Sequence, residues 1–315
     1  MRTITSADVS RPLASRSVVT IGNFDGVHRG HRELFQRVCR HAREERATSV
    51  VVTFAPHPLQ LLRPDRAPQL ITTPEQKRAL IAESDLDLLL VIPFTPAFAE
   101  MSADSFVRDI LVAGLGMVHL VIGHDYAFGR NREGNEQLLT RLADTLGFVV
   151  ESLDPVGDGE LIFSSSEVRR LVRLGEVAAA APILGRYHRI SGQVVHGREI
   201  GRSLGFPTAN ISTENQLIPA DGVYAVWVEA LGELHQGACS IGTNPTFAGG
   251  DRTIEAFLFD FNAPLYGEEI SIQFAGRLRG LVRFDNPSDL KEQIARDVAT
   301  ARTVLASGLP RRREP

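Results

Sequence analysis

The chain has 315 residues, of which 43% are hydrophobic and 23% charged, and its formal net charge is −4. This length predicts about two domains with sizeable cores, and the slight acidity argues against a general nucleic-acid binder. Cys39 and Cys239 form neither a metal-ligand spacing nor a disulfide framework. Residues 1–16 lack the apolar core of a signal peptide, and the apolar runs are too short to span a bilayer. We therefore expect a cytoplasmic protein with no membrane and no nucleic-acid partner.

The first half of the chain alternates strand patterns with helix patterns. Strands are predicted at 17–22, 47–54, 88–92, 118–123 and 148–151, and helices at 30–45, from 74, at 102–113 and at 136–145. A proline-rich loop is expected after the second strand. That strand is a continuous β-branched run, which is typical of a strand buried on both faces of a parallel sheet. The alternation predicts a doubly wound α/β domain whose ligands bind beyond the carboxyl ends of its strands.

The pattern changes after a helical stretch at 165–184, for which Ser164 or Ser165 is the expected N-cap. Short alternating strands follow at 189–195, 222–229, 235–241, 253–261 and 269–274. They predict a small antiparallel β-barrel or sandwich, closed by a C-terminal helix that starts at Pro287. We expect a doubly wound, Rossmann-like α/β domain over 1–184 and an antiparallel β-barrel domain with its helix over 185–315.

The first polar constellation, Gly22 to His31, reads GNFDGVHRGH and joins the first strand to a helix start. Such a turn directs backbone N–H groups and the positive end of the helix dipole at one point, which suits phosphate. The residues predicted to bind ATP or phosphate here are Gly22, Asn23, Phe24, Asp25, Gly26 and Gly30. Gly30 has no side chain, so we expect the nucleotide to approach its backbone closely. The alternative is a capped helix with two surface histidines.

His28 and His31 are the candidate catalytic residues of this turn, because imidazoles can donate hydrogen bonds to the oxygens of a phosphoryl transition state. The pattern resembles the HxGH signature of the nucleotidylyltransferase superfamily. It is not a Walker A loop, since neither lysine of the chain, Lys77 or Lys291, follows a glycine.

Three further segments are candidates for the same site. Two follow strands and carry aromatic rings that could hold a flat ring system; their candidate residues are Phe54, His57, Asp125, Tyr126 and Phe128. The third is a hydroxyl-rich helix start, in which Ser165, Ser166 and Arg169 could hold a triphosphate. Taken alone, each segment is more often a packed loop or a plain serine cap.

A second constellation lies in the predicted barrel. Gly197, Gly201 and Gly205 let the backbone approach a phosphate chain, and the sequence GFPTAN follows. Thr208 and Asn210 place two neutral oxygen ligands on one face of an extended segment, which suits Mg²⁺ that also binds phosphate oxygens. Glu255 is a candidate general base for a hydroxyl nucleophile, although a glutamate in a barrel strand often only faces solvent.

These motifs, with SIGTNPTF at 240–247 and Leu265-Tyr266-Gly267, occur in the order of one family. Over 15–306 the chain closely resembles the prokaryotic bifunctional riboflavin kinase/FAD synthetases. The resemblance implies that the barrel phosphorylates riboflavin with ATP and Mg²⁺ to FMN. It also implies that the α/β domain transfers AMP from ATP to FMN, giving FAD and pyrophosphate.

The resemblance assigns roles to the candidate residues. Thr208 and Asn210 would coordinate Mg²⁺ and the ATP phosphates, and Glu255 would activate the ribityl hydroxyl. His28 and His31 would stabilise the transition state of adenylyl transfer. The loop with Asp125, Tyr126 and Phe128 would line the flavin side, and Ser165, Ser166 and Arg169 would hold the triphosphate.

The chain also departs from the family pattern ahead of the serine pair. Ile162 and Phe163 stand where a basic residue is usual, Ser166 replaces a threonine, and Ala127 replaces a residue that is often basic or polar. One alternative is therefore a monofunctional riboflavin kinase whose N-terminal domain is a degenerate flavin- or nucleotide-binding module. A second alternative is a transferase with the HxGH motif that acts on a different substrate, but that alternative leaves the barrel without a function. The sequence leaves the oligomeric state open, with a weak homo-oligomer among the alternatives.

Overall fold

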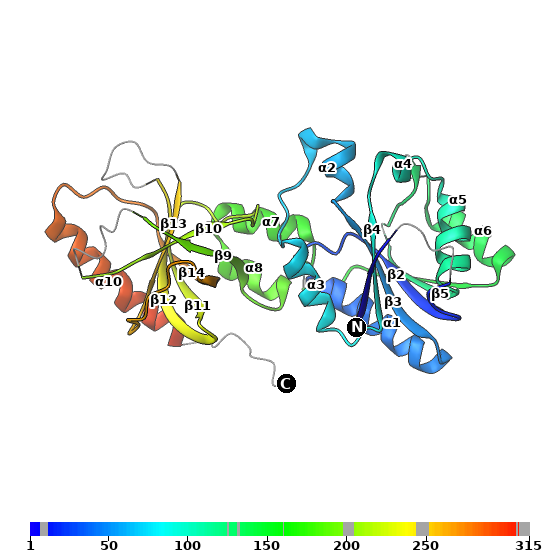
Figure 1. Ribbon diagram of the computed structural model, residues 1–315, viewed down its shortest axis with the longest axis horizontal. Coiled ribbons are helices and arrows are strands. Elements are labelled where there is room, and N and C mark those ends of the chain that lie inside the picture. The colour runs from blue at the N-terminus through cyan, green and yellow to red at the C-terminus, as the bar shows by residue number, and fades with distance from the viewer. Residues whose placement is uncertain are drawn as a thin grey trace. The chain divides into compact units, whose positions relative to one another are not determined.

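The structure is a computed structural model that describes residues 1–6, 12–124, 126–130, 133–159, 161–197, 205–243, 252–306 and 308. The chain folds into two compact units (Figure 1). The first comprises Met1–Gln69 and Pro74–Phe163, and the second comprises Leu70–Thr73 and Ser164–Pro315. The segment 164–184 thus packs with the second unit. The boundary at 184, drawn between two functional domains, stays a prediction.

The first unit is built on a parallel sheet of six strands in the order β1-β4-β3-β2-β5-β6. The strands are β1 (Arg2–Thr5), β2 (Ser17–Ile21), β3 (Thr48–Ala55), β4 (Leu88–Pro93), β5 (Met117–Gly123) and β6 (Val149–Leu153). Every residue of β2 is buried, as expected for a central strand covered on both faces. The predicted doubly wound α/β class is confirmed.

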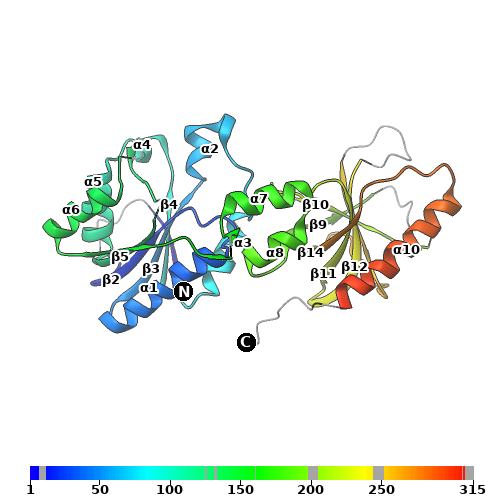
Figure 2. The same ribbon diagram turned by 180° about the vertical axis from the view of Figure 1, so that it is seen from behind.

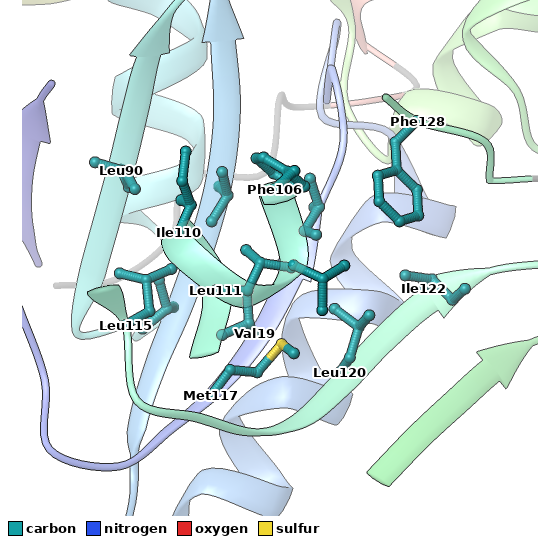
Figure 3. Close-up of a cluster of buried hydrophobic side chains, with 14 of the residues drawn as sticks. Val19, Leu90, Phe106, Ile110, Leu111, Leu115, Met117, Leu120, Ile122 and Phe128 are labelled. Carbon is teal, nitrogen blue, oxygen red and sulfur yellow. The ribbon is translucent and has the colours of Figure 1, made fainter. Parts of the chain in front are cut away.

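Helices cover both faces of this sheet. They are α1 (Arg29–Glu45), α2 (Pro58–Leu62), η1 (Pro64–Arg66), α3 (Pro74–Ala82), α4 (Pro96–Ala99), α5 (Ala103–Ser105), η2 (Phe106–Gly114) and α6 (Glu136–Leu146). Because strand side chains alternate between faces, Val18 packs with Phe35 of α1, whereas Val19 packs with η2. Figure 3 shows Ile110 and Leu111 of η2 in the hydrophobic cluster that contains Val19.

Several elements of the first unit differ from the sequence prediction. Strand β1 was not predicted, because it has only four residues and pairs through its backbone with β4. The expected proline-rich loop contains α2 and η1. The helix predicted at 102–113 begins as α5 and continues as η2, a π-helix. A two-stranded hairpin, β7 (Gly157–Asp158) with β8 (Leu161–Ile162), ends the unit.

The second unit is a closed antiparallel barrel in the order β10-β13-β12-β11-β14-β9, with β9 pairing back to β10. Its strands are β9 (His188–Val195), β10 (Ala209–Thr213), β11 (Gly222–Ala230), β12 (Glu233–Gly242), β13 (Thr253–Leu258) and β14 (Glu269–Arg279). Closure leaves the sheet no free edge. The barrel alternative of the prediction is therefore the correct one, and β10 is a strand that the sequence analysis did not predict.

Three helices belong to the second unit: α7 (Ser165–Leu174), α8 (Val177–Leu184) and α10 (Pro287–Ala306). The helical stretch predicted at 165–184 is divided at Gly175, whose φ of 78° ends α7. Helix α10 packs Ala301 and Leu305 against Trp227 on the outside of the barrel (Figure 2). None of the helices that the structure describes is long and apolar enough to cross a membrane.

A short piece of chain from the first half also packs into the second unit. Leu70 N–H donates to Gln216 Oε1 at 2.9 Å, and Leu70 O accepts from Leu217 N–H at 3.2 Å. Ile71 beside it is almost fully buried. The second unit is therefore made from two separate stretches of sequence.

Candidate active sites

The turn between β2 and α1 is held in an unusual backbone conformation. Phe24 and Val27 have φ values of 47° and 40°, and Gly26 has 80°. Side chains other than glycine rarely adopt such angles, and each instance costs about 1–3 kcal/mol. Packing stabilises the turn, since the ring of Phe24 is buried and lies 5.0 Å from that of Phe35. Strain retained in this way is common at functional sites.

The two histidines of the turn lie against each other. The rings of His28 and His31 stack with centroids 3.6 Å apart and planes 23° apart, and Phe24 meets His31 edge-on at 5.2 Å. His28 is 6% exposed, which contradicts the alternative of two surface histidines. The histidines stand at the start of α1, where the helix dipole favours negative groups.

The glycines of this turn make room for rings of the protein itself. A Cβ on Gly30 would lie 3.1 Å from His28 Cε1, and one on Gly22 would lie 2.8 Å from the Phe24 ring. The space that a side chain at Gly30 would fill is therefore occupied by the His28 imidazole, and close approach of a nucleotide to this backbone stays a prediction. Within the turn itself, Asp25 is buried and Asn23 is exposed.

Lys77 of α3 lies at this site although the sequence analysis did not predict it. Its ammonium donates to Asn23 O at 3.2 Å, Thr53 Oγ1 at 3.3 Å and Phe54 O at 3.4 Å, so it joins the carboxyl ends of β2 and β3. Burial lowers the pKa of Lys77, and the charge of Asp25 opposes that shift. No local motif marks this lysine, because the sheet brings its partners together from distant parts of the chain.

The predicted flavin-binding aromatics lie in the core of the first unit. Phe54 and Phe128 are only 9% and 7% exposed and pack with Phe106. Tyr126 stacks on Phe128 at 5.6 Å, and burial raises the pKa of its hydroxyl. These positions agree with the packed-loop alternative for the unliganded protein, and flavin contact stays a prediction.

The remaining candidates of the first site are placed as follows. His57 caps α2, with its Nδ1 accepting from Leu59 N–H at 3.2 Å. Ser164 caps α7 through Glu167 N–H at 3.2 Å, and Ser165, Ser166 and Arg169 follow in the first turns of that helix. Helix α7 belongs to the second unit. Asp125 lies outside the described residues.

The departures ahead of the serine pair have clear structural positions. Ile162 is 57% exposed at the end of the β7–β8 hairpin, whereas Phe163 is buried. The guanidinium of Arg29 lies 4.7 Å from the centroid of the Phe163 ring, a cation–π contact. Phe163 therefore packs against the residue that follows His28.

The barrel brings the predicted kinase residues together. Thr208 Oγ1 donates to Glu255 Oε2 at 3.3 Å, and Thr253 Oγ1 donates to Glu255 Oε1 at 3.1 Å. Asn210 is directly opposite Glu255 in the β10–β13 ladder. The two hydroxyls fix the orientation of the carboxylate, which lies one strand away from the two predicted metal ligands.

The glycines of this region have different roles. A Cβ on Gly197 would overlap the side-chain amide of Asn210, so that amide would have to move to admit one. Gly205 has a φ of 89°, which favours glycine. Gly201 lies outside the described residues, as do residues 244–247 of the SIGTNPTF stretch.

Two more features of the barrel lie near these residues. His196 stacks on the exposed ring of Tyr266 at 4.2 Å, one residue beyond Val195, which pairs with Asn210. Cys239 is fully buried, and burial, with a smaller contribution from the charge of Glu255, raises the pKa of its thiol. This thiol is a packed hydrophobic group rather than a nucleophile.

Comparisons with known proteins cover both halves of the chain. The FAD synthetase family model matches residues 10–167, and the riboflavin kinase family model matches 184–305. The chain is 41% identical over 286 residues to a bifunctional riboflavin kinase/FMN adenylyltransferase of Escherichia coli K12, covering 90% of this chain and 91% of that one. This chain belongs to the bifunctional riboflavin kinase/FMN adenylyltransferase family.

Other members of the family are similar over comparable lengths. A bifunctional riboflavin kinase/FMN adenylyltransferase of Pseudomonas fluorescens is 38% identical over 297 residues, covering 94% of this chain and 95% of its own. A crystal structure described as a macrolide-efflux protein from Streptococcus pneumoniae is 32% identical. It superposes with a TM-score of 0.86, covering 95% of this chain and 98% of its own. Both activities of the family, riboflavin kinase and FMN adenylyltransferase, have their domain in this chain, which confirms the predicted function.

Proposed function

We propose that the two sites described above carry out the two steps of FAD synthesis. The barrel transfers the terminal phosphoryl group of ATP to riboflavin, and the HxGH turn transfers AMP from a second ATP to the FMN so formed. The observation that carries the assignment is the grouping of Thr208, Asn210 and Glu255 on adjacent strands. The slight net negative charge argues against a nucleic-acid or anionic-membrane partner, and we propose small phosphorylated substrates in the cytoplasm.

In the kinase step Glu255 is the general base. It accepts the proton of the ribityl hydroxyl as that oxygen attacks the terminal phosphorus and ADP leaves. The hydrogen bonds from Thr208 and Thr253 hold the carboxylate ready for this transfer. A general base of this kind contributes about 10²–10⁴-fold to a rate.

The donor set beside Glu255 suits Mg²⁺. Thr208 and Asn210 offer hydroxyl and amide oxygens, the hard neutral ligands that this ion accepts together with phosphate oxygens. These two residues would hold the ion against ATP, and it supplies neutralisation of the phosphate charge. The absence of a side chain at Gly197 leaves room for the Asn210 amide in its present position.

In the adenylyl step a phosphate oxygen of FMN attacks the α-phosphorus of ATP, and the bond to the β-phosphate oxygen breaks to release pyrophosphate. His28 and His31 donate hydrogen bonds to the charged oxygens of the transition state. Lys77 acts as a positioning residue, since it ties the turn at Asn23 to the end of β3. Ser165, Ser166 and Arg169 at the start of α7 are the proposed triphosphate-binding residues, because backbone N–H groups at a helix start favour anions.

A product assay tests the proposal. Purified protein is incubated with riboflavin, ATP and Mg²⁺, and FMN and FAD are separated over time by chromatography. We expect FMN to rise first and then to convert to FAD. FMN that accumulates without FAD would instead support the monofunctional alternative, for which the missing cation at Ile162 is the supporting observation.

A further inference from the structure

A cluster of histidines and carboxylates lies at the opposite end of α1 from the HxGH turn. His41 of α1, His119 of β5 and Glu151 of β6 have ligand-type atoms within 4.8 Å of one another, the one such group found among the described residues. At about 1.5 Å of rise per residue, His41 lies about 18 Å along the helix from Arg29. The two reactions assigned above use none of these side chains.

The orientation of His119 points to a missing ligand. Its Nδ1 lies 2.8 Å from Glu45 Oε1, and since a carboxylate only accepts, Nδ1 carries the proton. The side chain is 8% exposed, and its Nε2 is buried without a hydrogen-bond partner among the described residues. The nearest carboxylate oxygen, Glu151 Oε2, is 3.8 Å away, too far for a hydrogen bond. A buried polar atom without a hydrogen bond lowers the stability of the fold unless a ligand or ion binds it.

Glu151 presents one oxygen to both histidines. Arg37 Nη1 binds its Oε1 at 2.7 Å, while its Oε2 lies 2.7 Å from His41 Nε2. The other ring nitrogen of His41, Nδ1, lies 3.3 Å from Glu44 Oε2. Each histidine therefore directs Nε2 toward Glu151; a glutamate of α1 binds Nδ1 of His119, and another lies near Nδ1 of His41. Histidine ligands of metals are oriented by carboxylates in the same way.

The distances fit a small tetrahedral ion. Two donors that each lie about 2.1 Å from such an ion are about 3.4 Å apart. The observed separations from Glu151 Oε2, 2.7 Å to His41 and 3.8 Å to His119, lie on either side of that value. All ligand-type atoms of the group lie within 4.8 Å of one another, so shifts of about an ångström would bring the three donors to coordination distance.

We propose that His41, His119 and Glu151 bind a divalent transition-metal ion of the zinc type, with Glu44 and Glu45 orienting the imidazoles. Two imidazole nitrogens favour such ions over Mg²⁺, which prefers oxygen ligands in octahedral geometry. The bound ion replaces the proton between His41 and Glu151 and fastens the end of α1 to β5 and β6. The site is structural, and it is separate from the metal that accompanies ATP.

Metal titration of the untagged full-length protein tests the proposal. After chelator treatment, Co²⁺ should bind with about one ion per chain and give the visible absorption of tetrahedral coordination, and Zn²⁺ should displace it. Saturating Zn²⁺ should raise the melting temperature of the first unit by about 3 °C or more. Far-UV circular dichroism and FMN formation by the barrel report that each variant remains folded.

Matched variants make the test specific. His41→Gln and His119→Gln should each weaken Co²⁺ binding at least about tenfold, and Glu45→Gln should weaken it by a similar factor through loss of ring orientation. His235→Gln removes a histidine that lies near Glu233 in the barrel, and it should leave binding unchanged. If His119→Gln fails to fold, the more exposed His41→Gln variant decides. Equal Co²⁺ binding by wild type and His41→Gln, or no binding by wild type, would overturn the proposal.

Discussion

Thr208 donates a hydrogen bond to Glu255 at 3.3 Å across 47 positions of sequence. This contact joins a predicted metal ligand to the predicted base, so the two functions of the kinase site share one hydrogen-bonded unit. Thr253 completes the unit from the strand that carries Glu255.

Replacement of this base gives the first prediction. Glu255→Gln keeps the shape of the side chain but cannot accept the ribityl proton, so FMN formation should fall about 10²–10⁴-fold. Riboflavin binding, followed by flavin fluorescence, and FAD formation from supplied FMN should persist. Glu233→Gln, at an exposed position of β12, is the matched control. Unchanged turnover of Glu255→Gln would contradict the assignment.

The HxGH turn gives the second prediction. His28→Gln or His31→Gln removes one donor to the transition-state oxygens, and FAD formation from FMN should fall about 10²–10³-fold. The loss should lie in kcat, because such donors act mainly on the transition state. FMN formation measured in the same preparation should not change, and His235→Gln serves as control. A parallel loss of both activities would indicate misfolding instead.

Lys77 gives a third prediction with a built-in control, because the chain has only one other lysine, the exposed Lys291 of α10. Lys77→Met removes three hydrogen bonds, to the Thr53 hydroxyl and to two carbonyls, which should lower the free energy of unfolding by about 1–3 kcal/mol. FAD formation should fall with it, since the turn at Asn23 is then tied to β3 through the Thr53 hydroxyl without the ammonium. Urea unfolding of Lys77→Met and of the control variant Lys291→Met checks this, and equal stabilities of the two variants would refute the positioning role.

The pKa of Lys77 gives a fourth prediction. Because burial lowers it below 10.5, the folded chain binds fewer protons than the unfolded chain between the lowered value and 10.5. Stability of the wild type should therefore rise with pH across that window relative to Lys77→Met. The difference between their urea midpoints, measured from neutral to alkaline pH, isolates this group from the buried cysteines. A flat difference would show that the lysine titrates as it does in the unfolded chain.

The exposed position of Ile162 gives a fifth prediction. Ile162→Arg restores the cation that is usual ahead of the serine pair, at a site with room for a long side chain. A solvent-exposed ion pair with phosphate should lower the KM of the adenylyl step about two- to fivefold. Ile162→Gln provides the polar, uncharged comparison and should leave KM unchanged. Added salt should reduce the gain from arginine.

Features that depend on neighbouring residues could be predicted from the sequence. Strand β3 was identified because its residues form one apolar β-branched run, and the HxGH turn because its residues are consecutive. Strand β1 and strand β10 were missed because their four and five residues are specified by pairing partners far along the chain.

Sites assembled by sheet register could not be found in this way. Lys77 meets Asn23 and Thr53 only because parallel strands end at one edge of the sheet. His41, His119 and Glu151 are separated by 78 and 32 positions and meet only through the register of β5 with β6. No spacing rule connects such residues in a single sequence.

The hydrogen bonds of Leu70 with Gln216 and Leu217 limit how the gene can be divided. A fragment that begins at residue 164 or 185 lacks Leu70–Thr73 and leaves the position of buried Ile71 empty. No single cut can therefore release the second unit whole. A kinase half expressed alone would have to carry this tetrapeptide as a grafted insertion, or fold with a gap where it belongs.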